Sequence, residues 1–159
     1  MSFASDNDLS RLSAAVTSAV AVDGVQTPLT AQQWTLLAPY LLPVNLAAGE
    51  VLFAQGAEDR SLYFIESGSF SVHYQDSKER IRLAMVGPGA IVGEGAFFAH
   101  RPRRATVQAA SAGRLWCLTA MRFAELGNRL PALALNVAMM AGQVLARRAV
   151  DRSRRVAST

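Results

Sequence analysis

The sequence predicts a mainly β fold, an antiparallel β-roll placed between N-terminal helices and a long C-terminal helix. Residues 44–118 consist of short apolar stretches separated by turn residues, whereas the flanking segments repeat apolar residues at helical spacing. The chain has 159 residues, of which 51% are apolar and 18% are charged, so it is long and apolar enough to bury one core. We therefore expect helices in residues 1–43, a β-roll in 44–127 and a helix with a basic tail in 128–159.

Two helices are expected before the roll. Apolar residues at helical spacing predict the first, which ends near Gly24; they are Leu9, Leu12, Val16 and Val20. Thr30 and Gln33 have the spacing of a capping box, and Pro39 interrupts the apolar run that follows. The second helix is therefore expected at residues 30–38. Both helices are expected to pack on the roll.

The strand signals come from alternation. Apolar and polar residues alternate along residues 69–74 and again along 80–85, with the period of a half-buried strand. Residues 75–78 join these strands as a hairpin loop. Glycines at short intervals, such as those in Gly87-Pro88-Gly89, supply turns typical of antiparallel barrels and sandwiches. These signals together predict the antiparallel roll.

Helical spacing returns after Cys117. Thr119 is expected to cap a short helix that ends at Gly127, and Pro131 suits the first turn of a longer helix that runs towards Arg155. The longer helix carries a seam with coiled-coil spacing, made of Leu133, Val137, Met140 and Val144. This seam suits two partners, the domain's own roll or the same helix of a second subunit. The second arrangement predicts a homodimer through the C-terminal helix.

Composition narrows the function classes. The single cysteine, Cys117, excludes internal disulfides, cysteine-rich zinc sites and iron–sulfur clusters, and it favours a reducing, cytoplasmic location. Cys117 lies in an apolar strand, which indicates a buried thiol rather than a nucleophile. His73 and His100 supply no cluster of metal ligands, so we expect neither a metal nor an enzyme. No apolar run approaches the roughly 18 residues of a membrane span.

The positive charge lies at the C-terminus. Residues 147–159 contain five arginines and one aspartate, whereas residues 1–146 carry 11 charges of each sign. The basic tail suits nucleic acid or an acidic partner, but arginines at the negative end of a helix dipole also explain it. Direct, sequence-specific DNA binding is not expected of this chain.

The stretch that begins at Gly93 carries the candidate chemistry. Gly93 and Gly95 lack side chains, so backbone can approach a ligand, and a helical turn starting near Ala96 would direct free N–H groups at an anion. The planar guanidinium of Arg103 can grip two phosphate oxygens. The carboxylate of Glu94 would repel a bare phosphate, but it accepts hydrogen bonds well from a ribose hydroxyl. Together these residues predict a site for a sugar phosphate.

This stretch resembles the phosphate-binding cassette of the cyclic nucleotide-binding domain family. The family pattern is Gly-Glu, a small residue two positions further on, and then Arg-x-Ala-Thr-Val-x-Ala. The residues that match in register are Gly93, Glu94, Ala96, Arg103, Ala105, Thr106, Val107 and Ala109. Further likeness lies in residues 48–52, in 59–68 and in the turn 87–89, so the resemblance covers about 44–127.

The resemblance implies an eight-stranded, jelly-roll-like β-roll whose ligand is a cyclic nucleotide. Glu94 would bind the ribose 2′-hydroxyl, and Thr106 would border the base. The cyclic phosphate would lie against Arg103 and the amides of Ala96 and Phe97. The implied ligand site comprises Gly93, Glu94, Gly95, Ala96, Phe97, Arg103, Arg104, Ala105 and Thr106.

Two residues depart from the family pattern. Gly95 replaces the usual aliphatic residue, which loosens the wall of the cassette. In relatives selective for cGMP a threonine follows the key arginine, whereas this chain has Arg104, which favours cAMP over cGMP. A contact to the base would come from the last helix, where the candidates are Asn136, Gln143 and Arg147.

The resemblance predicts a non-catalytic sensor module. It would bind a cyclic nucleotide and transmit occupancy through the C-terminal helix to an unknown downstream partner, as a regulator without its own DNA-binding domain. The alternative is a degenerate module on the same fold, a ligand-independent dimerisation or protein-interaction domain.

Overall fold

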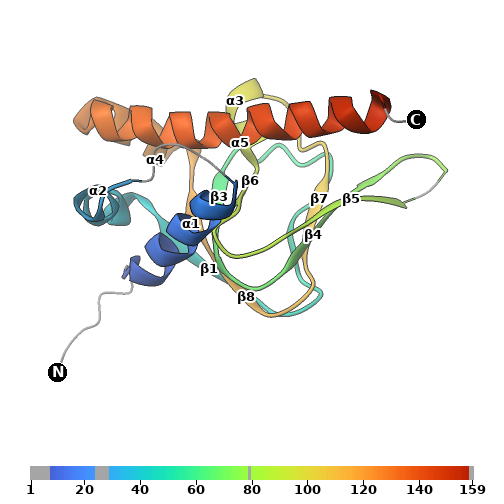
Figure 1. The fold of residues 1–159 in the computed structure, drawn as a ribbon, viewed down its shortest axis with the longest axis horizontal. Helices are drawn as coiled ribbons and strands as arrows, with labels where there is room; N and C mark the ends of the chain where they lie inside the picture. The colour runs from blue at the N-terminus through green and yellow to red at the C-terminus, as the bar shows by residue number, and fades with distance from the viewer. Residues whose placement is uncertain (1–7, 24–28, 79, 158–159) are drawn as a thin grey trace.

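The computed structural model describes residues 8–23, 29–78 and 80–157 and contains eight antiparallel strands in two sheets, with helices at both ends (Figure 1). The strands are β1 (Leu42–Leu46), β2 (Val51–Phe53), β3 (Leu62–Ser67), β4 (Phe70–Gln75), β5 (Arg80–Val86), β6 (Ile91–Val92), β7 (Thr106–Ala109) and β8 (Gly113–Leu118). The helices are α1 (Ser10–Asp23), α2 (Ala31–Leu37), the short 3₁₀ helix η1 (Ala38–Tyr40), α3 (Glu94–Ala99), α4 (Ala120–Arg129) and α5 (Pro131–Ala157). The predicted roll with flanking helices is confirmed.

The two sheets enclose one core and the helices cover another. The strand orders are β1-β8-β3-β6 and β2-β7-β4-β5. Along β3, Leu62 and Phe64 face the core beneath the helices, whereas Tyr63 and Ile65 face the core between the sheets. Because both faces of β3 are buried, its residues 62–65 form a continuous apolar run instead of an alternating one.

The N-terminal helices form where the sequence predicts them. Thr30 accepts a hydrogen bond from the Gln33 amide and Gln33 returns one to Thr30, so the capping box of α2 is present. The first helix is present as α1; its predicted end at Gly24 lies outside the described residues. Gly89, whose φ is +85°, lets α1 approach the turn before β6, because a Cβ there would lie 2.6 Å from that of Ala19.

The end of α4 differs from the sequence-based expectation. The helix passes Gly127 and ends at Arg129. Gly127 has no positive φ, so it does not form the left-handed turn that ends many helices. Leu130 precedes Pro131, whose ring disfavours helical backbone in the residue before it, and Leu130 has φ −134° and ψ 67°. The proline, not the glycine, therefore separates α4 from α5.

The seam on α5 packs against the domain itself. Leu133, Val137 and Met140 are at most 4% exposed and belong to the core beneath the helices, and Val144 packs on the same core. Of the two arrangements that suit the seam, the structure shows the first. As Figure 1 shows, α5 extends across one side of the molecule and passes α3, which it contacts. This packing places the long helix next to the predicted cassette.

Candidate functional site

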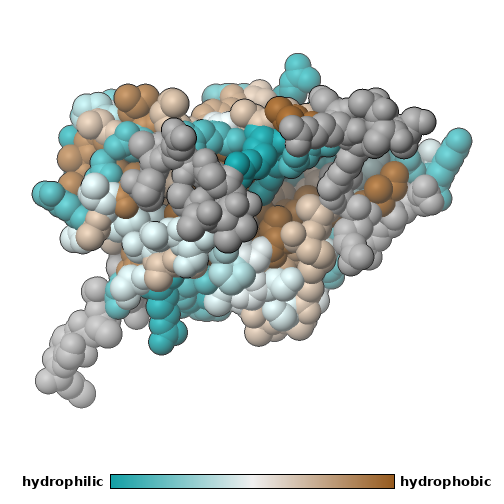
Figure 2. Space-filling view, in the orientation of Figure 1, coloured by the Kyte–Doolittle hydropathy of each residue, from teal (hydrophilic) through white to brown (hydrophobic). Residues whose placement is uncertain are grey.

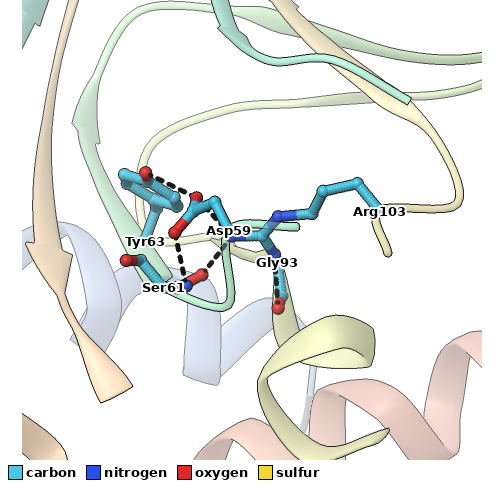
Figure 3. Close-up of polar contacts among 5 residues, drawn as sticks. All are labelled: Asp59, Ser61, Tyr63, Gly93 and Arg103. Atoms are coloured by element: carbon cyan, nitrogen blue, oxygen red, sulfur yellow. Dashed lines mark hydrogen bonds and ion pairs between the residues drawn. The ribbon is translucent and has the colours of Figure 1, made fainter. Parts of the chain in front are cut away.

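Arg103 lies at the centre of the candidate site. Its side chain is 2% exposed, and its guanidinium binds three oxygen atoms from two segments of the chain, 59–61 and Gly93. Nη2 donates to the Asp59 carboxylate at 2.8 Å and to the Ser61 carbonyl at 2.6 Å, while Nη1 donates to the Gly93 carbonyl at 2.9 Å (Figure 3). Gly93 precedes α3, so the guanidinium lies at the N-terminal end of that helix.

Gly93 is required by this arrangement. Its φ is +87°, a backbone conformation that residues with a side chain rarely adopt. A Cβ at this position would lie 2.6 Å from Nη1 of Arg103 and 2.7 Å from the Ser61 carbonyl oxygen. The sequence predicted that Gly93 would let a ligand approach the backbone closely. In the structure the group that approaches Gly93 is the guanidinium of Arg103.

Backbone and ring contacts fix Arg103 from the other side. Its amide donates to the Ala57 carbonyl and its carbonyl accepts from the Gly56 amide, each at 2.8 Å. Its guanidinium carbon lies 4.0 Å from the centre of the Phe53 ring, which is cation–π geometry. The side chain is thus held in one conformation before any ligand is considered.

Arg103 keeps unused hydrogen-bond donors, because the three bonds above use three of its N–H groups. An arginine has five N–H groups, and its Nε atom is buried without a hydrogen-bond partner among the described residues. A buried N–H without an acceptor destabilises a protein by about 1–3 kcal/mol. The site therefore combines a fully ordered guanidinium with an unused donor.

Asp59 balances the buried charge. Partial burial raises the pKa of Asp59, but hydrogen bonds from Arg103 and Ser61 outweigh this effect and hold the pKa below its ordinary value of 3.8. Tyr63 donates its hydroxyl hydrogen to the same carboxylate at 3.1 Å, and burial raises the pKa of that hydroxyl.

Burial also raises the pKa of Cys117. This thiol lies in the core between the sheets, as its apolar surroundings in the sequence predict.

A second ion pair joins the cassette to α5. Glu94, the first residue of α3, is buried, and its Oε1 accepts from Nη1 of Arg148 at 2.6 Å. Nη2 of Arg148 donates to the Ile91 carbonyl at 2.6 Å. Arg148 was not among the predicted site residues. The signal for it was available, because Arg148 follows Met140 and Val144 at steps of four along the buried seam.

The remaining cassette residues divide between core and surface. Ala96 is buried, and Phe97 stacks edge-to-face on Phe123 of α4 with ring centres 5.0 Å apart. The Phe97 amide donates to the Gly93 carbonyl at 3.2 Å inside α3. Gly95 does not have a positive φ, and a Cβ at this position would meet no atom within 4 Å. A side chain at this position would therefore have room, and the loosened cassette wall stays a prediction.

The three predicted site residues after Arg103 lead from the loop into β7, which begins at Thr106. Arg104 is exposed and Ala105 is half-buried. Thr106 is paired with His73 and accepts from the Gln55 amide at 2.9 Å. It lies on the face of β7 opposite to Val107, which points into the core between the sheets. The structure does not bring the Thr106 hydroxyl into that core.

The candidates for a base contact share one stripe of α5. Asn136, Gln143 and Arg147 are separated by seven and four residues, so they lie above one another on the helix. Asn136 and Gln143 are half-buried and Arg147 is exposed. Arg148 lies about 100° further round the helix. Arg148, whose contacts to Glu94 and Ile91 are described above, therefore lies beside this stripe, and the contact to the base stays a prediction.

Within residues 8–23, 29–78 and 80–157, no three side chains from His, Cys, Asp and Glu gather as metal ligands. His100, whose φ is +53°, ends α3 and contacts Arg60.

Among the described residues, no helix has the length and apolar character that a membrane span requires.

Comparison with known proteins agrees with the cassette and the fold described above. A family model described as the cyclic nucleotide-binding domain matches residues 43–129, more than half of the chain. The cAMP-dependent protein kinase type II regulatory subunit of Drosophila melanogaster is 36% identical over 73 residues, which is 46% of this chain and 19% of the relative. This chain spans less than a third of the length of the curated relatives that it matches.

Solved structures agree on the fold. A cyclic nucleotide-binding domain from Methylobacillus flagellatus KT superposes with a TM-score of 0.84 at 20% identity, covering 96% of this chain and 86% of that one. The catabolite activator protein of Thermus thermophilus gives a TM-score of 0.70 at 26% identity, covering 80% of this chain and 59% of that one. By its matching family model, its cassette and its fold, the chain belongs to the cyclic nucleotide-binding domain family.

Proposed function

We propose that this chain is a non-catalytic sensor module that binds a cyclic nucleotide. The observation that supports this most is Arg103, an ordered and buried guanidinium with one unused donor at Nε. An oxygen of a cyclic phosphate is a suitable acceptor, because charge-assisted hydrogen bonds to guanidinium are among the stronger ones. The buried carboxylate of Glu94 supplies an acceptor for a sugar hydroxyl from the same cassette.

The proposed ligand is cAMP in preference to cGMP. Arg104 stands where relatives selective for cGMP have a threonine, so the proposed site lacks that contact to guanine. A relative that is 36% identical over 73 residues is named as a cAMP-dependent regulatory subunit. Both observations favour adenine, and a direct comparison of the two nucleotides tests the preference.

We further propose that α5 transmits occupancy. Two contacts join the cassette helix α3 to the C-terminal helices: the Glu94–Arg148 ion pair and the stacked rings of Phe97 and Phe123. A ligand shifts an equilibrium only by binding one arrangement better than another, and these contacts give the site and the helix a shared wall. A change in the position of α3 is therefore expected to alter the packing of α4 and α5.

The proposed partner is a second copy of the chain. Residues spaced by four and three line the outward face of α5, opposite to its buried seam; they are Leu135, Met139, Gly142, Ala146 and Ala149. Leu135 is 61% exposed and Met139 is 53% exposed. A helix that is apolar on both faces is expected to be covered on both. The small residues would let two such helices approach closely.

Thermal unfolding with and without nucleotide tests the binding function. A ligand that binds only the native state adds about 2.7 kcal/mol of stability at 100 times its dissociation constant. We expect the melting temperature to rise with millimolar cAMP and to rise less with cGMP. No rise with either nucleotide would contradict the sensor and would favour the ligand-independent interaction domain on the same fold.

A further inference from the structure

Arg60 ties the segment that holds Arg103 to the C-terminal end of α3. The neighbours of Arg60 in the chain, Asp59 and Ser61, supply two of the three oxygens that bind the guanidinium of Arg103 (Figure 3). Arg60 itself is half-buried, and its Nη1 contacts Nδ1 of His100, the residue that ends α3. Because Arg103 also binds the residue before α3, this segment is linked to the helix at both of its ends.

The contact with Arg60 fixes the protonation state of His100. A guanidinium has N–H donors and no acceptor, so the ring nitrogen of His100 that faces it must be the acceptor. The imidazole is therefore neutral, with its hydrogen on Nε2. An imidazolium would present an N–H and a second positive charge to the guanidinium, and like charges repel. Proton uptake by His100 is thus incompatible with this contact.

The surroundings of His100 supply no counter-ion for an imidazolium. Among the described residues, no carboxylate forms an ion pair with its ring. From α5, the charged group that reaches α3 is Arg148, which binds Glu94 at the opposite end of that helix. A histidine changes its charge between about pH 5 and 8, so mild acidification is expected to open the contact. The charged residues that flank the contact in the sequence are Glu58, Asp59, Arg101 and Arg104, of which Asp59 is paired with Arg103.

We propose that His100 is a positioning residue that makes the affinity for the nucleotide depend on pH. In its neutral form His100 holds Arg60, and with it the segment 59–61, in the arrangement that orders Arg103 for the phosphate. Protonation of His100 releases this segment and weakens binding. The inference rests on the proposed nucleotide binding and adds regulation by acidity to the same site. Its direction is opposite to that of simple attraction, by which an added positive charge strengthens the binding of an anion.

Calorimetric titration with cAMP at about pH 7.5 and about pH 5.5, on either side of an ordinary histidine titration, tests this role. The wild type is expected to bind about fivefold to tenfold more weakly at the lower pH. His100→Asn should match the wild type at the higher pH and lose nothing at the lower one. Asparagine tolerates the left-handed backbone at φ +53°, and its amide oxygen accepts from Arg60 without titrating. His73→Gln, which removes the other of the two histidines, is the control and should keep the loss.

Arg60→Met provides the second arm of the test. It removes the contact at either pH, so its affinity for cAMP should equal that of the acidified wild type throughout. Adding His100→Asn should then change little, because both residues act on one contact. A wild-type affinity that stays constant or rises on acidification would overturn the inference. A His100→Asn protein that keeps the full loss at low pH would overturn it as well.

Nuclear magnetic resonance of the histidine rings of the wild type keeps the inference testable should a variant fail to fold. Coupling between two binding events is reciprocal, so a proton that weakens nucleotide binding must itself be bound more weakly in the complex. Saturating cAMP is therefore expected to move the titration of His100 to lower pH. An unchanged titration would overturn the inference, whereas a wild type that binds cAMP at neither pH would overturn the proposed function.

Discussion

The guanidinium of Arg103 joins the start of β3 to the start of α3 through the carbonyls of Ser61 and Gly93. Arg103→Ala is expected to weaken cAMP binding by about 2–5 kcal/mol, because a buried charge partner of the phosphate is removed. It should also lower the melting temperature, since Asp59 loses its ion pair. Arg101→Ala, which removes an exposed arginine of the same loop, is the control. Calorimetry giving equal affinities for Arg103→Ala and wild type would move the phosphate contact elsewhere.

Asp59 predicts a dependence of stability on pH. Its pKa in the folded chain lies below the ordinary value of 3.8 because of hydrogen bonds from Arg103 and Ser61. A lowered pKa contributes stability above 3.8, and this contribution is lost as the pH falls through the folded-state pKa. Urea unfolding should therefore find wild type more stable than Asp59→Asn at neutral pH, with the gap closing below about pH 4. A gap that stays constant down to pH 3 would contradict the assignment.

At the scale of elements, the two glycines at the N-terminal end of α3 differ in backbone conformation and in the space available for a side chain. Gly93 has φ +87° and no room for a Cβ, whereas Gly95 lies inside the helix with open space around it. Gly93→Ala is expected to cost about 2 kcal/mol or more of unfolding free energy and to displace Arg103. Gly95→Ala should instead stabilise by about 0.5–1 kcal/mol, because glycine disfavours helix. Urea unfolding of the Gly93→Ala and Gly95→Ala variants measures the sign of each change in unfolding free energy. Equal changes would mean that α3 begins elsewhere.

Local chemistry decided which elements could be predicted from the sequence. The capping box of α2 and the glycine-arginine spacing of the cassette involve neighbours in the chain, so their residue types identified them. The end of α4 was misplaced because Gly127 suggested a cap, whereas Pro131 determined the break. The partner of the seam on α5 could not be chosen, because coiled-coil spacing suits packing on the roll as well as pairing with a second helix, and only the packing distinguishes the two.

At the scale of the whole molecule, the site depends on pairs far apart in the sequence. Asp59 and Arg103 are separated by 44 residues, and Arg148 reaches a carbonyl 57 residues away. No periodicity in the chain encodes such pairs, so the sequence predicted the cassette but not the two carboxylate–arginine pairs that hold it. Figure 3 shows the first pair beside Gly93, at the N-terminal end of α3. Figure 1 shows why the second pair is possible, since α5 crosses the roll beside that helix.

The outward face of α5 leads to a prediction for the assembled molecule. Figure 2 shows apolar surface at the end of the molecule where α2, α4 and the beginning of α5 lie. Among the exposed apolar residues, Met139 belongs to the outward face of α5, whereas Met121, which is 75% exposed, belongs to α4. If two copies pair through α5, Met139→Lys places like charges opposite each other in the pair.

Light scattering during size-exclusion chromatography measures this pairing. The wild type and Met121→Lys are expected to elute as dimers, and Met139→Lys as a monomer with an unchanged far-ultraviolet circular dichroism spectrum. Because the seam that packs on the roll lies on the opposite side of α5, the variant should keep its core and its nucleotide site. A Met139→Lys protein that remains dimeric would exclude the outward face as the contact. A monomeric wild type at micromolar concentration would exclude the homodimer itself.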